Sequence, residues 1–259
     1  MRDAGLDDAV RAAGGVSELA RKIGISQPSV SNWARVPAER VLIVETTTGV
    51  DRKILRPDLY EKPGENSRES DEVSSARAQE YALLAAMLAR APDARLLENL
   101  ASLRGDATPL GVAHVALAQA ASETTVERVE REYFDLFIGL GRGELLPYGS
   151  YYLTGFLNER PLARLRTDLA PLGIERVEGN AEPEDHAATL CEIMSGLVSG
   201  RLPAPAGADQ TIFEKHLAPW IGRFFADLEQ TKAANLYRHV GMLGRVFMDI
   251  ETQAFALPS

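Results

Sequence analysis

Three carboxylates and a histidine occupy residues 182–186, in the stretch "GNAEPEDHAATLCEIMSGL", directly ahead of an apolar run. Side chains of these types can act as a general acid and base, coordinate a metal ion, cap a helix or bind a cationic group. Which of these roles applies depends on the elements that position the cluster and on the other side chains brought near it.

The apolar residues that follow the cluster recur with the period of a helix. Pro183 suits the first turn of a helix and an apolar stripe runs from Leu190 onward, so we expect a helix over residues 183–200. The carboxylates would then lie at the positive end of the helix dipole, with Asp185 on the polar face. His186 precedes Leu190 by four residues and should lean toward the buried face. A capped helix with an inward histidine is therefore one interpretation.

Metal binding and catalysis have little support elsewhere in the chain. Glu182 and His186 are four residues apart and could share one ion, but no second pair of suitable ligands has such spacing. The sequence contains no nucleophile elbow, no phosphate-binding P-loop and no glycine-rich dinucleotide turn after a strand. We therefore expect no enzyme activity, no metal and no cofactor. This leaves a helix cap, or an acidic edge that receives a cationic partner.

Composition and charge are typical of a soluble protein with two unlike parts. No apolar run approaches the roughly 18–20 residues that a membrane span needs, and the acidic N-terminus does not resemble a signal peptide. Cys191 is the only cysteine, so no internal disulfide is expected, and a cytoplasmic location follows most simply. The formal charge is −9, which disfavours a general nucleic-acid binder, yet residues 1–65 carry equal numbers of basic and acidic side chains. The whole negative charge therefore resides beyond them.

The chain is expected to divide near residue 70. The stretch "EKPGENSRESDEVSS" contains proline, glycine, four serines and a single apolar residue. Such a composition cannot bury itself and predicts a flexible linker. We assign residues 1–62 to a small N-terminal domain, 63–75 to the linker and 76–259 to a larger domain.

Helical periodicity dominates the larger domain, and its segments are separated by proline and glycine breaks. The one strand candidate, "IERVEG" at 174–179, is weak. We therefore predict an all-α fold. The expected helices span residues 76–91, 93–104, 109–121, 124–139, 149–157, 160–172, 183–200, 209–227 and 232–255.

Residues 14–36, "GGVSELARKIGISQPSVSNWARV", have the layout of a helix-turn-helix. Ser17 can cap a first helix, and Pro28 fits the first turn of a second helix whose Val30 and Trp33 face inward. The second helix then offers amide, hydroxyl and guanidinium groups to base edges and phosphates. The candidate DNA-binding residues are Gln27, Ser29, Ser31, Asn32 and Arg35.

This pattern resembles the Cro-like, YdaS-type DNA-binding domains of phages and antitoxins, and the resemblance runs through most of residues 9–60. It implies a DNA-binding domain of four or five helices that usually functions as a dimer. The alternative is a fold that now serves only for docking or dimerisation.

Two further stretches carry a second resemblance. The segment at 132–153, "EYFDLFIGLGRGELLPYGSYYL", has the pattern aromatic-aromatic-x-L-F followed by P-aromatic-x-S-x-aromatic. The segment at 213–229, "FEKHLAPWIGRFFADLE", contains H-L-x-P-W. Together with E-P-x-D-H at 182–186, these motifs are similar, in order, to those of the TorD/DmsD family of helical chaperones for molybdenum-containing oxidoreductases. The similarity covers roughly residues 76–255.

The TorD/DmsD resemblance implies a protein that binds a client protein and catalyses no reaction. Such chaperones hold the twin-arginine signal peptide and the apo form of a molybdopterin-containing oxidoreductase during cofactor insertion, before Tat export. Carboxylates can take guanidinium groups in bidentate hydrogen bonds, and tyrosine faces suit the apolar segment of a signal. The implied signal-peptide-binding residues are Pro147, Tyr148, Tyr152, Glu182, Pro183, Asp185 and His186.

The main alternative is a DNA-binding transcriptional regulator whose helical domain senses a client or ligand. A combined role, in which client occupancy alters DNA binding, would follow from the fusion itself. Both resemblances are to families that dimerise, which leaves a homodimer open.

Overall fold

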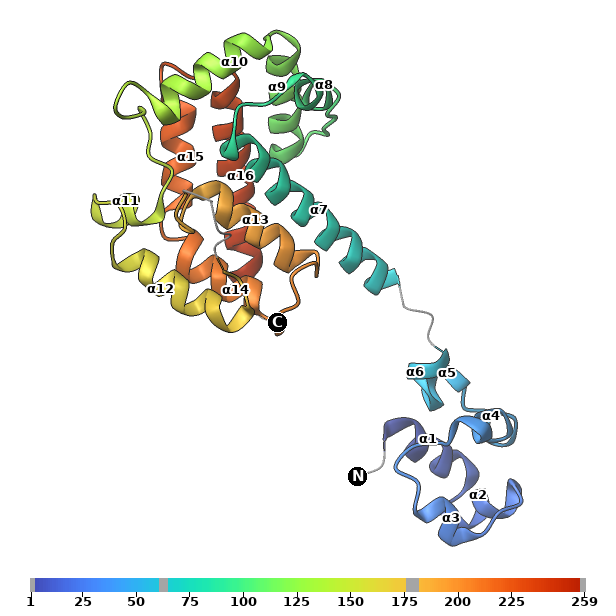
Figure 1. The fold of residues 1–259 in the computed structure, drawn as a ribbon. Coiled ribbons are helices and arrows are strands. Elements are labelled where there is room, and N and C mark those ends of the chain that lie inside the picture. Colours follow the sequence, from blue (N-terminus) through green and yellow to red (C-terminus); the bar gives the residue numbers. More distant parts are fainter. Residues whose placement is uncertain (1–2, 61–64, 176–181, 257–259) are drawn as a thin grey trace. The chain divides into compact units, whose positions relative to one another are not determined.

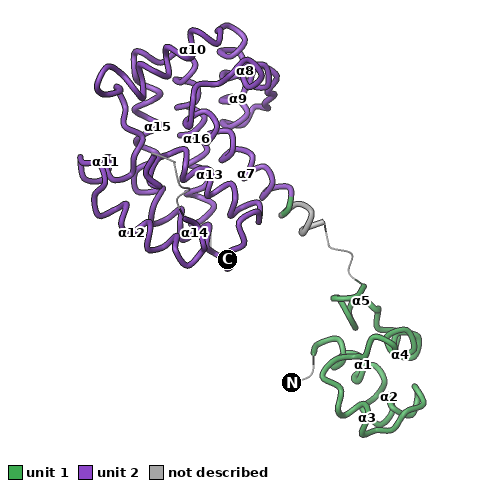
Figure 2. The backbone as a smooth tube through the Cα atoms, viewed as in Figure 1, with its two compact units in different colours: residues 1–71 green, residues 72–259 purple. Residues whose placement is uncertain are grey.

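The computed structural model describes residues 3–60, 65–175 and 182–256, with side chains for all of these except residues 65–70. The chain forms two compact units, residues 1–71 and 72–259 (Figure 2). The described residues form helices and no strand beyond one isolated bridge, which confirms the predicted all-α fold. None of the described helices combines the length and the apolar character that a membrane crossing needs.

The small unit packs short helices around one apolar core (Figure 1). Leu6, Leu19, Val30, Val44 and Leu55 are completely buried in this core. Helices this short are unstable in isolation, so their burial against one another is what stabilises them. They are α1 (Ala4–Ala13), α2 (Val16–Lys22), α3 (Gln27–Ser31), η1 (Ala38–Arg40), α4 (Val41–Thr48), α5 (Arg52–Leu55) and α6 (Pro57–Tyr60).

The helix-turn-helix of the small unit is built from α2 and α3. Gly15 rather than Ser17 precedes α2, so the expected serine cap is wrong. Gly24 turns the chain in the left-handed region at φ 73°, a conformation that favours glycine. Ser26 then caps α3, because its hydroxyl accepts a hydrogen bond from the amide of Ser29. The second helix is five residues long.

The segment predicted as a flexible linker is helical instead, since residues 65–75 belong to the long helix α7 (Glu65–Ala89). This stretch contains no proline or glycine, and extending an existing helix costs far less than starting one. The anchoring part of α7 lies further along the chain, where Tyr81 and Leu84 are completely buried. The division between the two compact units falls inside this helix.

The larger unit is a helical bundle around one core, in which α15 packs along α16 and α16 also packs against α9 (Figure 1). Large aromatic side chains, among them Tyr81, Trp220, Phe224 and Tyr237, fill this core. The remaining elements are α8 (Ala94–Ala101), α9 (Pro109–Ser122), α10 (Val126–Tyr133), η2 (Phe134–Ile138), α11 (Gly149–Thr154), α12 (Arg160–Leu169), η3 (Ala170–Leu172), α13 (Ala187–Val198), α14 (Ala208–Ile212), η4 (Phe213–Leu217), α15 (Ile221–Gln230) and α16 (Leu236–Ala256).

Several predicted helices of the larger unit differ from the observed ones. The helix expected over 124–139 is divided into α10 and the π-helix η2. The helix expected over 183–200 is α13, which begins only after His186 because the preceding residues pair with a distant segment. The helix expected over 209–227 is interrupted, since α14, the π-helix η4 and α15 follow one another with Pro219 before α15. The strand candidate at 174–179 lies mostly outside the described residues.

Candidate functional site

The turn at 147–152 and the acidic segment at 182–186 meet through their backbones. Tyr148 and His186 form an isolated antiparallel bridge. The amide of Gly149 donates to the carbonyl of Asp185 at 2.9 Å, and the amide of Ala187 donates to the carbonyl of Pro147 at 2.8 Å. The starts of α11 and α13 are thereby joined, although Ser150 and Asp185, which also meet there, are 35 residues apart in the chain.

Asp185 is buried, with 3% of its surface exposed, and not on the polar face of a helix as expected. Its Oδ2 atom accepts a hydrogen bond from the amide of Ser150 at 2.7 Å, which caps the first turn of α11. Within the described part of the chain, its Oδ1 atom and the Ser150 hydroxyl are buried without a hydrogen-bond partner. Buried polar atoms without a hydrogen-bond partner are uncommon in folded proteins. These two atoms therefore mark a place where a ligand can donate a hydrogen bond to Asp185 and accept one from Ser150.

His186 is buried, as the sequence predicted, and serves as the cap of α13. Its Nδ1 atom accepts a hydrogen bond from the amide of Ala188 at 3.1 Å. The ring of Tyr148 packs edge-on against the imidazole with centroids 5.0 Å apart. Burial lowers the pKa of His186, while the charges of Glu182 and Asp185 oppose that shift. The folded protein therefore favours the neutral imidazole.

Replacing His186 with asparagine is expected to remove part of the loss of stability in acid. Because burial lowers the His186 pKa below its ordinary value of 6.5, its contribution to stability is complete above pH 6.5. That contribution is lost as the pH falls from 6.5 through the lower pKa of the folded state. Asparagine retains an acceptor for the Ala188 amide. The measurement is the free energy of unfolding in urea, taken at several pH values for the wild type and the variant. Below pH 6.5, the slopes of this free energy against pH should differ between the two proteins by up to about 1.4 kcal/mol per pH unit. Identical slopes would contradict this account.

The three carboxylates of the acidic segment 182–186 have different partners. Glu182 is exposed, and its Oε2 atom accepts a hydrogen bond from the Tyr148 hydroxyl at 2.5 Å. Glu184 instead pairs with Arg166 of α12, at 2.8 Å. Pro183 is half-buried and its carbonyl accepts from the His186 amide. Only Asp185 therefore points its charge inward, while Glu182 stays at the surface beside Tyr148.

Tyr152 of α11 packs against Trp220, which lies directly before α15. The ring of Tyr152 lies 5.6 Å from that of Trp220, and the Tyr152 hydroxyl donates to Asp227 at 3.1 Å. Trp220 is buried, as the sequence predicted, and its indole N–H donates to the carbonyl of His216 at 2.6 Å. A Cβ atom at Gly149 would lie 2.9 Å from this indole nitrogen, so glycine allows the close approach. Three motifs distant in sequence thus form one site.

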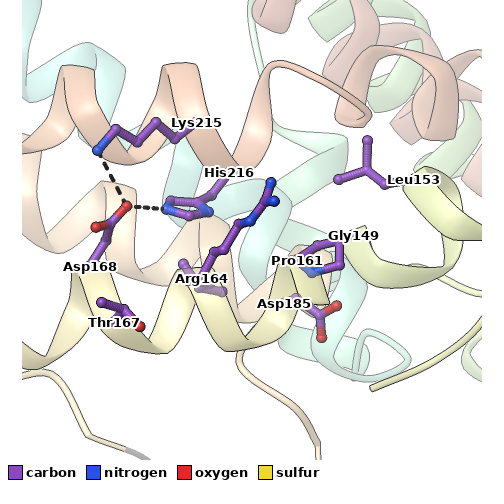
Figure 3. A pocket seen from close by; sticks show the side chains of 10 residues that line it. Gly149, Leu153, Pro161, Arg164, Thr167, Asp168, Asp185, Lys215 and His216 are labelled. Carbon is purple, nitrogen blue, oxygen red and sulfur yellow. Dashed lines mark hydrogen bonds and ion pairs between the residues drawn. The ribbon is translucent and has the colours of Figure 1, made fainter. Parts of the chain in front are cut away.

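A pocket of about 430 Å³ opens beside Asp185, between α11, α12 and η4 (Figure 3). Arg164 reaches into it from α12, while Asp168 accepts from His216 Nε2 at 2.9 Å and from Lys215 at 3.4 Å. The hydrogen bond with His216, and then the charge of Lys215, hold the pKa of Asp168 below its usual value against the effect of burial. The lining residues are Gly149, Leu153, Pro161, Arg164, Leu165, Thr167, Asp168, Asp185, Lys215 and His216.

Arg164, Asp168 and Lys215 line the pocket but were not predicted from the sequence. Arg164 and Asp168 are four residues apart in an amphipathic segment, which places them on one helix face and was the available signal. Nothing in the sequence indicates that this face meets Lys215 and Asp185, because that meeting depends on the packing of α12 against η4 and α11.

Apolar side chains are exposed along the segments that flank the site. Leu140 is 98% exposed and Phe156 is 69% exposed, values unusual for large apolar residues. Further exposed members lie in η2, in α11 and just after α11. Together they are Phe134, Ile138, Leu140, Leu153, Phe156 and Leu157. Surfaces of this kind mark places where partners bind.

In the small unit, the structure places the candidate DNA-binding residues at the surface. Gln27, Ser29, Ser31, Asn32 and Arg35 are all exposed. Arg35 lies beyond the end of α3, and not on the second helix as expected, and it forms an ion pair with Asp58 at 3.6 Å. Among the described residues of the whole chain, no group of three or more His, Cys, Asp or Glu side chains could hold a metal ion.

Comparison with known proteins adds family matches for both units. Residues 103–226 match the family described as "Nitrate reductase delta subunit", and residues 6–63 match the family described as "Bacterial toxin YdaS". The chaperone protein TorD of Vibrio cholerae serotype O1 is 29% identical over 126 residues, which cover 45% of this chain and 57% of that relative. TorD of Shewanella loihica is 22% identical over 204 residues, which cover 70% of this chain and 93% of the relative.

A solved structure from Archaeoglobus fulgidus, described as a redox enzyme maturation protein, overlaps 68% of this chain and 93% of its own. Its sequence identity is 20% and its TM-score is 0.45. The chain spans little more than half of the length of the Vibrio cholerae relative. On these matches, the larger unit of this chain is similar to the TorD chaperones, and its small unit is similar to the YdaS-type domains.

Proposed function

We propose that this protein is a chaperone that binds the twin-arginine signal peptide and the apo form of a molybdopterin-containing oxidoreductase during cofactor insertion, before Tat export. The proposal places the protein in the cytoplasm, where such a client would be held. One observation carries it most directly: the segments 147–152, 182–186 and 216–220, which resemble the motifs of the family, meet in the structure. The Tyr148–His186 bridge joins the first two, and Trp220 packs against Tyr152.

Asp185 supplies the most specific contact for the signal. A buried carboxylate oxygen without a donor costs about 1–3 kcal/mol, so a ligand group that donates to Oδ1 recovers that free energy on binding. A guanidinium group carries five N–H donors in a planar fork and is suited to a carboxylate. The 430 Å³ pocket gives such a group a route to Asp185 past Arg164.

The exposed surface suits the remainder of a signal peptide. The apolar side chains between residues 134 and 157 offer contact area to an apolar segment. Glu182, whose carboxylate accepts a hydrogen bond from the Tyr148 hydroxyl, places negative charge where a second arginine can approach. The formal charge of −9 also favours the approach of a cationic peptide.

Replacing Asp185 with asparagine is expected to weaken signal-peptide binding by about tenfold or more, because the charge is lost while an acceptor for the Ser150 amide remains. The measurement is titration of the full chain into a panel of labelled twin-arginine signal peptides from molybdopterin oxidoreductases. Wild-type protein should bind at least one peptide with micromolar or tighter affinity, and a Lys-Lys version of that peptide should bind more weakly.

Glu192→Gln is the matched control, since it removes the same charge from an exposed position of α13. It should leave the affinity nearly unchanged. Equal binding by the Asp185 and Glu192 variants, with no preference for Arg-Arg over Lys-Lys, would refute the role of Asp185. Failure of every peptide to bind the wild-type protein would refute the proposed function itself.

A second candidate function is DNA-binding regulation by the small unit. It is favoured by the exposure of Gln27, Ser29, Ser31 and Asn32 on and just after α3, together with the match to a helix-turn-helix family. These side chains can donate to and accept from base edges. A client-dependent change in DNA affinity would join both functions in one chain.

Replacing Asp58 with asparagine is expected to strengthen DNA binding. Asp58 pairs with Arg56 at 2.7 Å and with Arg35 at 3.6 Å, so its charge offsets two guanidinium groups near the candidate surface. The affinity of the full chain for duplex DNA should rise. The slope of log affinity against log salt concentration should become steeper, by an amount that corresponds to about one more counterion released on binding. Arg35→Gln should have the opposite effect. Unchanged affinity in both variants would exclude Arg35 from the interface.

A further inference from the structure

A second pocket, of about 620 Å³, lies between the end of α9, one face of α10 and the first turn of α16. Arg128 and Arg131 line it from α10, one helical turn apart, and Arg238 lines it from α16. His239 is half-buried beside them. Three guanidinium groups and an imidazole from separate helices therefore face one concave site, in a chain whose formal charge is −9.

These three arginines are brought together at one pocket without a carboxylate partner in the part of the chain that the structure describes, unlike several other arginines of the larger unit. Arg77 and Arg245 each lie 2.7 Å from a carboxylate oxygen. Among the described residues, the guanidinium groups of Arg128, Arg131 and Arg238 form no ion pair or hydrogen bond. Like charges gathered without partners repel one another, and an anion bound among them would relieve that repulsion.

The acidic side chains of the pocket are largely engaged elsewhere. Glu132 is buried and accepts three hydrogen bonds, from the amides of Asn235, Leu236 and Tyr237. Glu123 accepts from the side chain of Gln119 at 3.0 Å. Because Glu132 already occupies the amides at the start of α16, an anion in this pocket would bind the guanidinium groups and not the helix end. Asp135 also lines the pocket, and its carboxylate forms no hydrogen bond or ion pair within the described residues.

We propose that this pocket binds a small anion bearing two linked phosphate groups, held by Arg128, Arg131 and Arg238. Its volume lies within the range of small-molecule sites. Guanidinium groups bind phosphate oxygens in bidentate fashion, and three of them match more charge than a single phosphate carries. This site is separate from the signal-peptide site, and it does not depend on the proposed chaperone function.

His239 provides a local readout of occupancy. Burial, and then the neighbouring charge of Arg238, lower the pKa of its imidazole, while Glu132, Glu123 and Glu229 oppose that effect. A bound phosphate anion would neutralise Arg238 and stabilise the imidazolium form, so the His239 pKa should rise on binding. The chain has four histidines, and the other three, at positions 114, 186 and 216, serve as internal references.

The experiment is titration of inorganic pyrophosphate into the full chain, followed by calorimetry and by nuclear magnetic resonance of histidine-labelled protein. We expect saturable binding at one site, with a dissociation constant below about 1 mM, a selective shift of the His239 signal and a rise in its pKa. Arg131→Gln combined with Arg238→Gln should weaken binding by about tenfold or more. Arg95→Gln, at an exposed position of α8, is the matched control and should bind as wild type does.

Three results would overturn the proposal. The first is the absence of a saturable His239 shift up to about 10 mM pyrophosphate, since weaker binding would not reflect a built site. The second is equal weakening by Arg95→Gln, which would indicate non-specific attraction. The third is equal affinity for citrate, which would show that the pocket does not select phosphate groups.

Discussion

Glu251→Gln is expected to lower the free energy of unfolding of the larger unit by about 2–4 kcal/mol. Glu251 is completely buried near the end of α16. Its two oxygens accept from Arg77 at 2.7 and 2.8 Å, and Oε2 also accepts from the Tyr81 hydroxyl at 2.9 Å. Glutamine keeps the volume but leaves the partly buried Arg77 without its main counter-charge.

The measurement is urea unfolding followed by the fluorescence of Trp220, in a Trp33→Phe background that leaves one tryptophan. Replacing the whole network by apolar residues of similar size, as Arg77→Met, Tyr81→Phe and Glu251→Met together, should cost less than the single change. No buried charge is then left unpaired. A triple variant less stable than Glu251→Gln would contradict this explanation.

Glu132→Ala is the second change expected to have a large effect, lowering the unfolding free energy by about 3–5 kcal/mol. Glu132 lies on α10, yet its carboxylate accepts from the amides of Asn235, Leu236 and Tyr237 at 2.7, 3.2 and 2.8 Å. It thus caps the other end of α16 from a different helix. Alanine would leave three amides without an acceptor and open a cavity beside them.

Glu132→Gln distinguishes the hydrogen bonds from the charge. One amide oxygen can still accept from Asn235 and Tyr237, so its effect should fall between those of wild type and alanine. Glu130→Ala, at an exposed position of the same helix, should change stability by less than about 0.5 kcal/mol. Equal effects at positions 130 and 132 would rule out the cap.

The two carboxylates show how much of this fold lies beyond sequence patterns. The helices α10 and α16 are predictable from apolar periodicity, because a period of 3.6 residues follows from the helix itself. No local pattern indicates that Glu132 and Glu251 are buried at opposite ends of α16, since their partners lie 103 and 174 residues away. Buried charge is decided by which helices pack together.

The candidate signal-peptide site shows the same division. Its motifs could be located in the sequence, and so could the burial of His186 and Trp220, because they rest on residue type and helical spacing. The role of Asp185 could not, since a helix starting at Pro183 would have placed its carboxylate in solvent. The bridge between Tyr148 and His186 delays the start of α13 and turns Asp185 inward toward Ser150.

By itself, the sequence determined the all-α class, the helix-turn-helix and the order of three family motifs. These properties depend on periodicity, turn residues and residue identity, which are local. Tertiary structure alone decided that residues 65–75 continue a helix, that Arg164 and Lys215 join Asp185 at one pocket, and that three unpaired arginines meet at another. The two pockets depend on contacts between segments far apart in the chain, where packing and burial outweigh local preference. The stretch 65–75 extends a helix whose anchoring residues, Tyr81 and Leu84, are buried in the core of the larger unit.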